Sequence, residues 1–336
     1  MASLFDVARR VITRLEIVSQ TLSLRKVHGE EASYSPSPLP LSDVDTLVGK
    51  TVLISGGSRG IGLAIATACA KAGANVVIAA KTTIPHPKLP GTIYTAAEAI
   101  NQSCAGRAMA IQLDVRDEIA VQRAVDEAVA EFGSIDILIN NASAIHLDQI
   151  EHTPVKKFDL MFCINVRGTF LLTQACLPHL RRSQHSHVVT LSPPINLDPK
   201  WFKQYGAYTT SKYAMSLLSQ SFSEEFAADD IAVSSLWPKT AIATSAVANM
   251  MAGKLIEGGC RKPSIMADAC LALISQLPSD HKNGFYLDED VLRAQGVKDF
   301  DAYSCHPGKP LQRDLFLDDD IHGKPNESTF SVMKSD

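Results

Sequence analysis

A tyrosine and a lysine four residues apart, Tyr208 and Lys212, are the pair in this chain whose types and spacing most directly suggest chemistry. On a helix, residues at this spacing share one face, so the lysine ammonium lies one turn from the phenol. A free tyrosine, with a pKa of about 10, is a poor acid–base catalyst at neutral pH. A nearby positive charge favours the phenolate and lowers this pKa. We therefore predict that Tyr208 donates or accepts a proton and that Lys212 lowers its pKa.

A glycine-rich stretch, SGGSRGIG, joins a predicted strand at 51–55 to a predicted helix at 60–73. Glycines at this junction let the backbone turn tightly and approach a pyrophosphate without an intervening Cβ. The free N–H groups and the positive dipole at the start of the helix then bind the phosphate charge. No Lys-Ser or Lys-Thr pair follows, which argues against a Walker A loop. The residues predicted to bind a dinucleotide here are Gly56, Gly57, Ser58, Arg59, Gly60, Ile61 and Gly62.

The end of the second predicted strand, VVIAAK, indicates which dinucleotide binds. An acidic residue there hydrogen-bonds the ribose 2′-hydroxyl of NAD, whereas a basic residue accommodates the 2′-phosphate of NADP. This strand ends in Lys81, and Arg59 adds a second positive charge nearby, so NADP(H) is favoured over NAD(H). The alternative is that both bases are solvated surface residues. Asp114, at the end of the third strand, could accept a hydrogen bond from adenine or could cap the following turn.

Short apolar runs alternate with longer stretches of helical periodicity from residue 51 onward. Strands that are apolar throughout, with helices between them, are typical of a parallel sheet covered on both faces. Right-handed crossovers then give a doubly wound α/β fold of the Rossmann type. The seven predicted strands are 51–55, 75–81, 108–115, 135–142, 187–192, 231–238 and 284–290. The predicted helices are 60–73, 118–133, 161–180, 208–226 and 266–276.

The composition argues against several other classes of protein. The formal charge of −4, without a strongly basic run, argues against nucleic-acid binding. The longest apolar runs fall well short of the roughly 20 residues that span a bilayer, so no transmembrane segment is expected. The 7 cysteines form no Cys-x-x-Cys pair and are expected to be reduced, as in an intracellular protein. We interpret His185 and His187 as a surface pair rather than a metal site, and we predict no metal.

The two ends of the chain differ from the region between them. Residues 1–26 carry several arginines among apolar and hydroxyl residues, as a mitochondrial transit peptide does, but a surface helix or disordered extension of a cytoplasmic protein fits equally well. A Pro/Ser-rich linker follows, and the polar C-terminus lacks the peroxisomal Ser-Lys-Leu signal. The predicted divisions are an N-terminal extension at 1–47, one NADP-binding domain at 48–300 and a partly mobile C-terminal extension at 301–336.

Five motifs in order resemble those of the short-chain dehydrogenase/reductase family over about residues 50–290: SGGSRGIG, LDV, NNAS, the asparagine at 165 and YTTSK. Three longer stretches resemble one branch of this family more closely: AAKTTIPHPKLPGTIYTAAEAI, SPPINLDPKWFKQYGAYT and LWPKTAIAT. Animal members of that branch carry a sterol-carrier domain after the dehydrogenase domain. The residues after 300 have neither the length nor the periodicity for one, so we expect none here.

The resemblance implies roles for single residues. Asn140 and Ala142 would line the cofactor cleft, and Asp114 would contact the adenine. Lys212 would hold the hydroxyls of the nicotinamide ribose. The backbone of Asn165 would anchor a water molecule in a proton relay from Lys212.

The hydroxyl that would polarise the substrate carbonyl is the main departure from the family. The family has Ser-Ser after the fifth strand, the second serine being catalytic, whereas here Ser192 is followed by two prolines. Pro193 takes the catalytic position by alignment and has neither a hydroxyl nor an N–H group. Either Ser192 takes this role in a reshaped loop, or another group such as Asn196 donates the hydrogen bond. Loss of such a donor costs about 3–4 kcal/mol in a hydrolase, which slows an enzyme without abolishing its activity.

Further departures concern the cofactor cleft and its cover. Ser143 stands where the family motif has glycine, Lys239 replaces the glycine of a Pro-Gly pair, and Thr244 lies one place later than usual. We expect local adjustments with binding preserved, because backbone contacts survive side-chain changes. Residues 244–261 are rich in alanine and methionine, which suits a mobile lid over an apolar ligand or a plain surface helix.

These observations predict an NADP(H)-dependent oxidoreductase that interconverts a secondary alcohol and a ketone on an apolar, lipid-like substrate. The alternative is an NADP(H)-binding sensor or assembly protein with little turnover. The resemblance also implies a homodimer or homotetramer formed through the helices that carry Asn165 and Tyr208.

Overall fold

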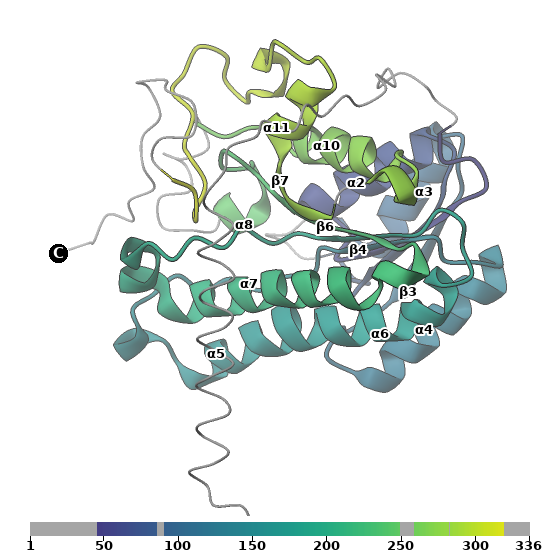
Figure 1. Cartoon of the computed structure of the whole chain (residues 1–336), viewed down its shortest axis with the longest axis horizontal. Coiled ribbons are helices and arrows are strands. Elements are labelled where there is room, and N and C mark those ends of the chain that lie inside the picture. Colours follow the sequence, from purple (N-terminus) through teal and green to yellow (C-terminus); the bar gives the residue numbers. More distant parts are fainter. Residues whose placement is uncertain (1–45, 86–90, 249–258, 282, 319–336) are drawn as a thin grey trace, which may run out of the picture. The chain divides into compact units, whose positions relative to one another are not determined.

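Seven parallel strands form the centre of the fold (Figure 1). The computed structural model describes residues 46–85, 91–248, 259–281 and 283–318, so the predicted transit peptide lies outside the described residues. The sheet order is β3-β2-β1-β4-β5-β6-β7, which confirms the predicted doubly wound fold. The strands are β1 Thr51–Ser55, β2 Asn75–Ala80, β3 Ala108–Gln112, β4 Ile137–Asn140, β5 His187–Thr190, β6 Ala232–Trp237 and β7 Gly284–Leu287.

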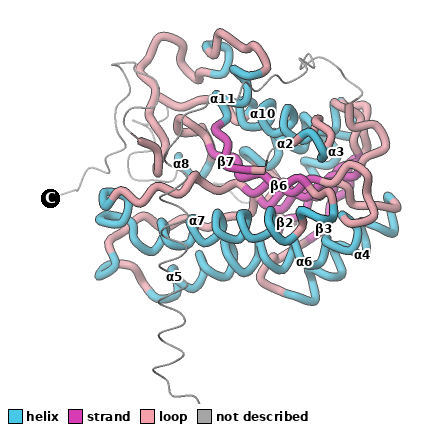
Figure 2. Tube along the Cα trace, in the orientation of Figure 1, coloured by secondary structure: helices cyan, strands magenta, loops and turns pink. Residues whose placement is uncertain are grey.

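Helices cover both faces of the sheet (Figure 2). Val52 and Ile54 of β1 belong to one apolar cluster with α2, α3, α10 and α11, whereas Leu53 belongs to another with α4, α6 and α7. Successive strand residues point to opposite faces, so the two clusters lie on the two sides of the sheet. The helices are α2 Gly60–Lys71, α3 Ile93–Ser103, α4 Glu118–Phe132, α5 Val155–Met161, α6 Thr169–Leu180, α7 Pro199–Glu225, α8 Ser245–Ala248, α10 Ser264–Ile274 and α11 Asp288–Ala294.

Two helices near the site, α3 and α11, do not follow from the sequence pattern. At the start of α3, Thr92 and Thr95 form a reciprocal capping box in which threonine takes the place of the usual glutamate. Helix α11 begins at Asp288, inside the range predicted as the last strand. Its first turn is acidic, which suits the positive end of the helix dipole.

The described residues beyond the predicted domain boundaries pack against the domain. Leu47 is fully buried, and its backbone N–H donates to the carbonyl oxygen of Ala72 at 3.0 Å. At the other end, residues 301–318 include Leu315, Phe316 and Leu317, which are all buried in one cluster with helix α7. This part of the predicted C-terminal extension is therefore integral to the fold.

One apolar helical stretch bears on membrane association. Val155–Leu180 is long and apolar enough to cross a membrane, with a mean hydropathy of 1.4 over its most apolar window. Some 44% of that window is buried inside the fold, where α6 packs on the sheet. A core helix meets the same criterion, so this is weak evidence for a span.

His185 and His187 are buried, and their interpretation as a surface pair is wrong. The ring of His187 lies 4.9 Å from that of His185 and 5.7 Å from that of His281, measured between centroids. Each ring uses Nε2: His185 and His187 donate to the carbonyl oxygens of Ile274 and Gln276, and His281 pairs with the Ser234 hydroxyl. Burial lowers the pKa of His187 to about 3 and that of His281 to about 4. The three histidines are therefore neutral structural residues.

We predict that these histidines destabilise the fold in acid. A pKa below the unfolded value of 6.5 means that the unfolded chain binds more protons, so stability falls as pH falls from 6.5 toward 4. Each histidine contributes up to about 1.4 kcal/mol per pH unit. Asp288 and Asp314, with pKa values raised by burial to about 7, act in the opposite direction in the same window.

The effect must therefore be measured as a difference between variants. Urea unfolding of wild type and His187→Gln between pH 7 and 4.5 isolates the histidine contribution. The wild-type chain is expected to lose more free energy of unfolding than the variant toward acid pH. Parallel pH profiles for the two chains would show that His187 does not carry this effect.

Candidate active site

The glycine turn lies where β1 ends and α2 begins, and its backbone requires glycine at several points. Gly56 and Gly60 have φ angles of 69° and 57°, in the left-handed region that other residues rarely adopt. At Gly62, an added Cβ would lie 2.5 Å from both Nδ2 of Asn141 and the carbonyl oxygen of Gly56. The side chain at the N-cap of α2, Arg59, does not cap the helix. The turn thus has the close-packed backbone and helix start that fit a pyrophosphate.

Two residues that sequence reasoning missed, Ser55 and Asn141, hold this turn against β4. Nδ2 of Asn141 donates to the carbonyl oxygens of Ser55 at 2.8 Å and Gly56 at 3.1 Å. The Ser55 hydroxyl accepts from the backbone N–H groups of Asn141 and Ala142. The preceding Asn140 points elsewhere, because its Nδ2 donates to the hydroxyl of Thr173 on α6. The consecutive asparagines at the end of β4 were the available signal, since alternation along a strand sends them to opposite faces.

The two bases at the adenosine end are each hydrogen-bonded or ion-paired within the chain. Arg59 donates to the carbonyl oxygen of Gly91 at 2.9 Å. Lys81 lies 3.2 Å from Asp114, which also accepts a bidentate pair from Arg116. The hydrogen bonds from Arg116 hold the pKa of Asp114 well below its usual range.

Asp114 also caps the turn that follows β3, since its Oδ1 accepts from the backbone N–H of Arg116 at 3.1 Å. Capping was one of the two roles that the sequence left open. Lys81 and Arg116 both pair with the single carboxylate of Asp114, so this group of three side chains keeps a net positive charge. This charge fits an anionic group such as a 2′-phosphate.

Tyr208 and Lys212 lie on one face of α7, as predicted, but the helix begins earlier than expected, at Pro199. Asp198 caps it, and Tyr205 (φ −133°, ψ 41°) kinks it one turn before Tyr208. Tyr208 is 5% exposed and Lys212 is 2% exposed. Nζ of Lys212 donates to the carbonyl oxygen of Leu191 at 2.6 Å, just after β5. The pair is therefore fixed at the carboxyl ends of the central strands.

The electrostatics of this pair correct the expectation that Lys212 lowers the pKa of Tyr208. Burial, reinforced by the charge of Asp314, raises the pKa of Tyr208 well above its usual range. Burial also lowers the pKa of Lys212 to about 7, although Asp314 opposes this. A lysine that is only partly charged at neutral pH gives the phenolate little support. Tyr208 is thus a neutral phenol in this conformation, which suits proton donation.

Asn165 lies in a π-helical segment, Phe162–Gly168, between α5 and α6. Its Oδ1 accepts from the backbone N–H of Ala144 at 2.7 Å, and its Nδ2 donates to the Ser211 hydroxyl at 3.0 Å. Single π-helical turns inside α-helices are frequent at functional sites. Asn165 therefore ties the loop after β4 to the helix that carries Tyr208. Its carbonyl oxygen accepts from the hydroxyl of Thr169 at 2.6 Å.

Neither candidate for the carbonyl-polarising donor is free in this conformation. The Ser192 side chain is fully buried and donates to the Ser235 hydroxyl on β6 at 3.1 Å. Nδ2 of Asn196 donates to Asp318 at 2.7 Å, and its Oδ1 accepts from the backbone N–H of Asp198. Both groups are therefore engaged with other partners in this structure.

Lys239, the replacement for the family glycine, takes part in a buried ionic cluster. Its Nζ lies 3.0 Å from Glu289, which also pairs with Arg261 and with Arg293. Burial alone would raise the pKa of Glu289, but the charge and hydrogen bond of Arg261 outweigh it, so the pKa is lowered. The backbone of Arg261 also forms an isolated parallel β-bridge with that of Ile242. The cluster therefore anchors both ends of the predicted lid at 244–261, of which residues 249–258 lie outside the described part.

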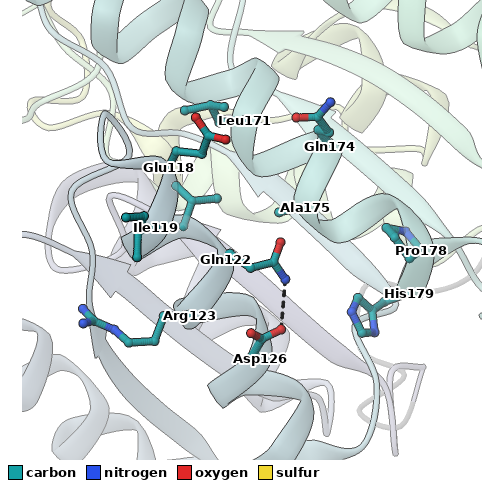
Figure 3. Close-up of a pocket in the computed structure, with 11 residues that line it drawn as sticks. Glu118, Ile119, Gln122, Arg123, Asp126, Leu171, Gln174, Ala175, Pro178 and His179 are labelled. Carbon is teal, nitrogen blue, oxygen red and sulfur yellow. Dashed lines mark hydrogen bonds between the residues drawn. The ribbon is translucent and has the colours of Figure 1, made fainter.

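A groove of about 810 Å³ lies between α4 and α6 (Figure 3). Gln122 and Asp126 of α4 are hydrogen-bonded along one side, and His179 of α6 lies near its end. None of the predicted site residues lines this groove. We therefore do not assign the catalytic site to this groove, despite its volume.

Comparison with known proteins gives this geometry a family. The family model for short chain dehydrogenases matches residues 50–254. The chain belongs to the short-chain dehydrogenase family. Members of this family are oxidoreductases that bind a nicotinamide cofactor, and the glycine turn with its Cβ-excluding packing fits such a cofactor. The oxidoreductase class and the Rossmann-like fold predicted from the sequence are thereby confirmed.

Within the short-chain dehydrogenases, this chain is similar to hydroxysteroid dehydrogenase-like protein 2. The protein of that name from Danio rerio is 52% identical over 287 residues, which cover 85% of this chain and 67% of that protein. The Homo sapiens protein is 50% identical over 294 residues, or 87% of this chain and 69% of that protein. A solved short chain dehydrogenase from Mycobacterium thermoresistibile is 48% identical, with a TM-score of 0.76 over 81% of this chain and 96% of that one.

Proposed function

We propose that this short-chain dehydrogenase interconverts ketones and secondary alcohols with NADP(H). The observation that carries the proposal is the buried pair Tyr208 and Lys212 on one face of α7, at the same end of the sheet as the glycine turn. Tyr208 belongs to a buried apolar cluster that also contains Met161 and Leu287, which favours an apolar substrate.

The chain's own residues account for the proton transfer. The neutral phenol of Tyr208 donates its proton to the carbonyl oxygen during reduction, and the phenolate takes one from the alcohol in reverse. Lys212 is placed to replace that proton and to bind ribose hydroxyls once it leaves the carbonyl of Leu191. Asn165 positions Tyr208 through Ser211, whose hydroxyl donates to the carbonyl oxygen of Tyr208 at 2.8 Å. When bound, the reduced nicotinamide supplies the hydride.

The preference for NADP(H) rests on the positive group at the ends of β2 and β3. Lys81 is more than half exposed and is held at the strand end by Asp114, so its ammonium is available to a 2′-phosphate. Arg59, at the N-cap of α2, provides a second positive charge. No acidic residue follows β2 directly to select the 2′-hydroxyl of NAD.

The cofactor preference predicts the result of a binding titration. Lys81→Ala is expected to weaken NADPH binding about tenfold or more, because a charge-assisted hydrogen bond contributes roughly 1.5–3 kcal/mol. NADH binding should change little. The fluorescence of the bound nucleotide measures both, and Lys71→Ala at the far end of α2 is the matched control. Tighter binding of NADH than of NADPH by the wild-type chain would contradict the assignment.

The burial of the catalytic pair favours one alternative. A chain whose Tyr208 and Lys212 are 5% and 2% exposed fits a nucleotide-binding sensor or assembly protein with little turnover. Turnover of any ketone with NADPH would exclude a sensor or assembly protein without catalytic activity. The predicted homo-oligomer also stays a proposal, supported by Phe170 on α6 and Leu217 on α7, which are both exposed.

A further inference from the structure

The segment at 312–318, here called the C-terminal strap, is drawn in yellow in Figure 1. Its residues Leu315, Phe316 and Leu317 belong to the same buried cluster as Tyr208. Its backbone follows the residues after β6: Ala241 donates to the carbonyl oxygen of Gln312 at 2.8 Å, and Asp314 donates to that of Lys239 at 3.1 Å. Beyond Asp314, Nε1 of Trp237 donates to the carbonyl oxygen of Leu315 at 3.0 Å. The strap thus runs from the carboxyl end of β6 onto α7.

Phe316 is the centre of this cover. Its ring lies 6.0 Å from that of Tyr208, 5.2 Å from that of Tyr213, 5.7 Å from that of Trp201 and 5.8 Å from that of Trp237, measured between centroids. These separations are typical of favourable aromatic contacts. We call these four surrounding rings the aromatic box. Phe316 itself is 1% exposed, so its ring fills the box.

The backbone conformation of Phe316 indicates that packing inside the aromatic box holds its ring in place. Its φ angle is 74°, a left-handed conformation that is unfavourable for a residue with a bulky side chain. Such a conformation persists only where the surrounding packing over-determines it, and it occurs often at ligand clamps and switch regions. The aromatic contacts of the ring supply that packing.

A carbonyl substrate must reach the hydroxyl of Tyr208, and the box is where its neighbouring apolar group would lie. We propose that the ring of Phe316 occupies the substrate subsite, and that substrates with a flat, phenyl-sized ring beside the carbonyl displace the C-terminal strap. The proposal rests on the proposed function for its carbonyl chemistry. It adds that the substrate carries an aromatic ring beside its carbonyl or carbinol carbon.

Both tryptophans of the chain, Trp201 and Trp237, belong to the aromatic box, so their fluorescence reports directly on its occupant. The full chain is titrated with α-tetralone, a ring ketone, without cofactor. Phe316→Ala is expected to bind α-tetralone at least tenfold more tightly than wild type, because no internal ring competes. The KM for α-tetralone with NADPH should fall by a similar factor.

The matched control is Leu317→Ala, which removes a buried apolar side chain from the same strap but not from the box. It is expected to change α-tetralone affinity less than threefold. Equal or weaker binding by a folded Phe316→Ala variant would overturn the proposal, since Phe316 would then be a wall of the site. If Phe316→Ala fails to fold, Phe316→Leu takes its place: it should bind α-tetralone more tightly than wild type, and weaker binding would overturn the proposal.

The two proposals fail in different ways. Tightened α-tetralone binding without NADPH oxidation by any variant would refute the proposed function and leave the ring subsite standing. Oxidation of NADPH with ketones that carry no aromatic ring, with no effect of Phe316 on the affinity for α-tetralone, would support the proposed function and refute the ring subsite. The double variant Phe316→Ala/Tyr208→Phe should keep the gain in ring affinity without turnover.

Discussion

Tyr208→Phe is expected to lower kcat for NADPH-dependent ketone reduction by about 10²–10⁴-fold, because it removes the proton donor and leaves the ring in place. The Tyr208 ring packs against Phe316 at 6.0 Å, and phenylalanine preserves that contact. Ligand affinity should therefore change little while turnover is lost. Steady-state NADPH absorbance measures kcat, and tryptophan fluorescence measures binding.

A phenol elsewhere in the chain provides the control for this substitution. Tyr94→Phe removes the hydroxyl of a tyrosine that is 55% exposed on α3, and it is expected to leave kcat unchanged. Melting temperatures of all three chains exclude a folding defect. A Tyr208→Phe variant that reduces ketones at the wild-type rate would show that another group donates the proton.

The second large effect concerns stability and the buried ionic cluster. Glu289→Gln is expected to destabilise the fold by about 3–5 kcal/mol, because it removes the carboxylate that forms ion pairs with both buried cations, Lys239 and Arg261. Both cations are less than one-tenth exposed, so water cannot replace the carboxylate. Urea unfolding at pH 7 measures the change in the free energy of unfolding.

Two further variants separate this effect from a general disturbance of α11. Asp290→Asn changes the adjacent, exposed carboxylate and should cost less than about 0.5 kcal/mol. Adding Lys239→Met to Glu289→Gln should recover part of the loss, because one unpaired buried charge is removed. If Glu289→Gln proves as stable as wild type, Glu289 does not balance the buried cations.

Patterns within short stretches of the sequence predicted the strands, the glycine turn and the shared helix face, because neighbouring residues determine these features. Each strand core was recognisable because apolar runs are short and bounded by turns, and the doubly wound architecture then followed from the right-handed crossover. The glycine turn was recognisable because its backbone conformations at Gly56 and Gly60 exclude other residues. The shared face of Tyr208 and Lys212 follows from helix geometry alone.

What the sequence did not reveal depends on contacts between distant residues. Phe316 meets Tyr208 across more than a hundred residues, and nothing in the sequence around Phe316 marks an aromatic box. Lys239 looked like a departure from a family motif until Glu289, fifty residues later, supplied its partner. Ser192 has the right residue type, but a hydrogen bond to Ser235 on the neighbouring strand occupies its hydroxyl. Burial at Tyr208 likewise reversed the expected direction of its pKa shift.

The central claim is that the glycine turn and the Tyr208–Lys212 pair form one working oxidoreductase site. The most direct test incubates the full chain with α-tetralone and NADPH that carries deuterium at the transferable position of C4, and then analyses the product by mass spectrometry. Wild type is expected to form an alcohol with one deuterium on the former carbonyl carbon, and Tyr208→Phe is expected to form it about 10²–10⁴-fold more slowly. An alcohol without deuterium, or the same labelled alcohol from both chains at equal rates, would contradict the central claim.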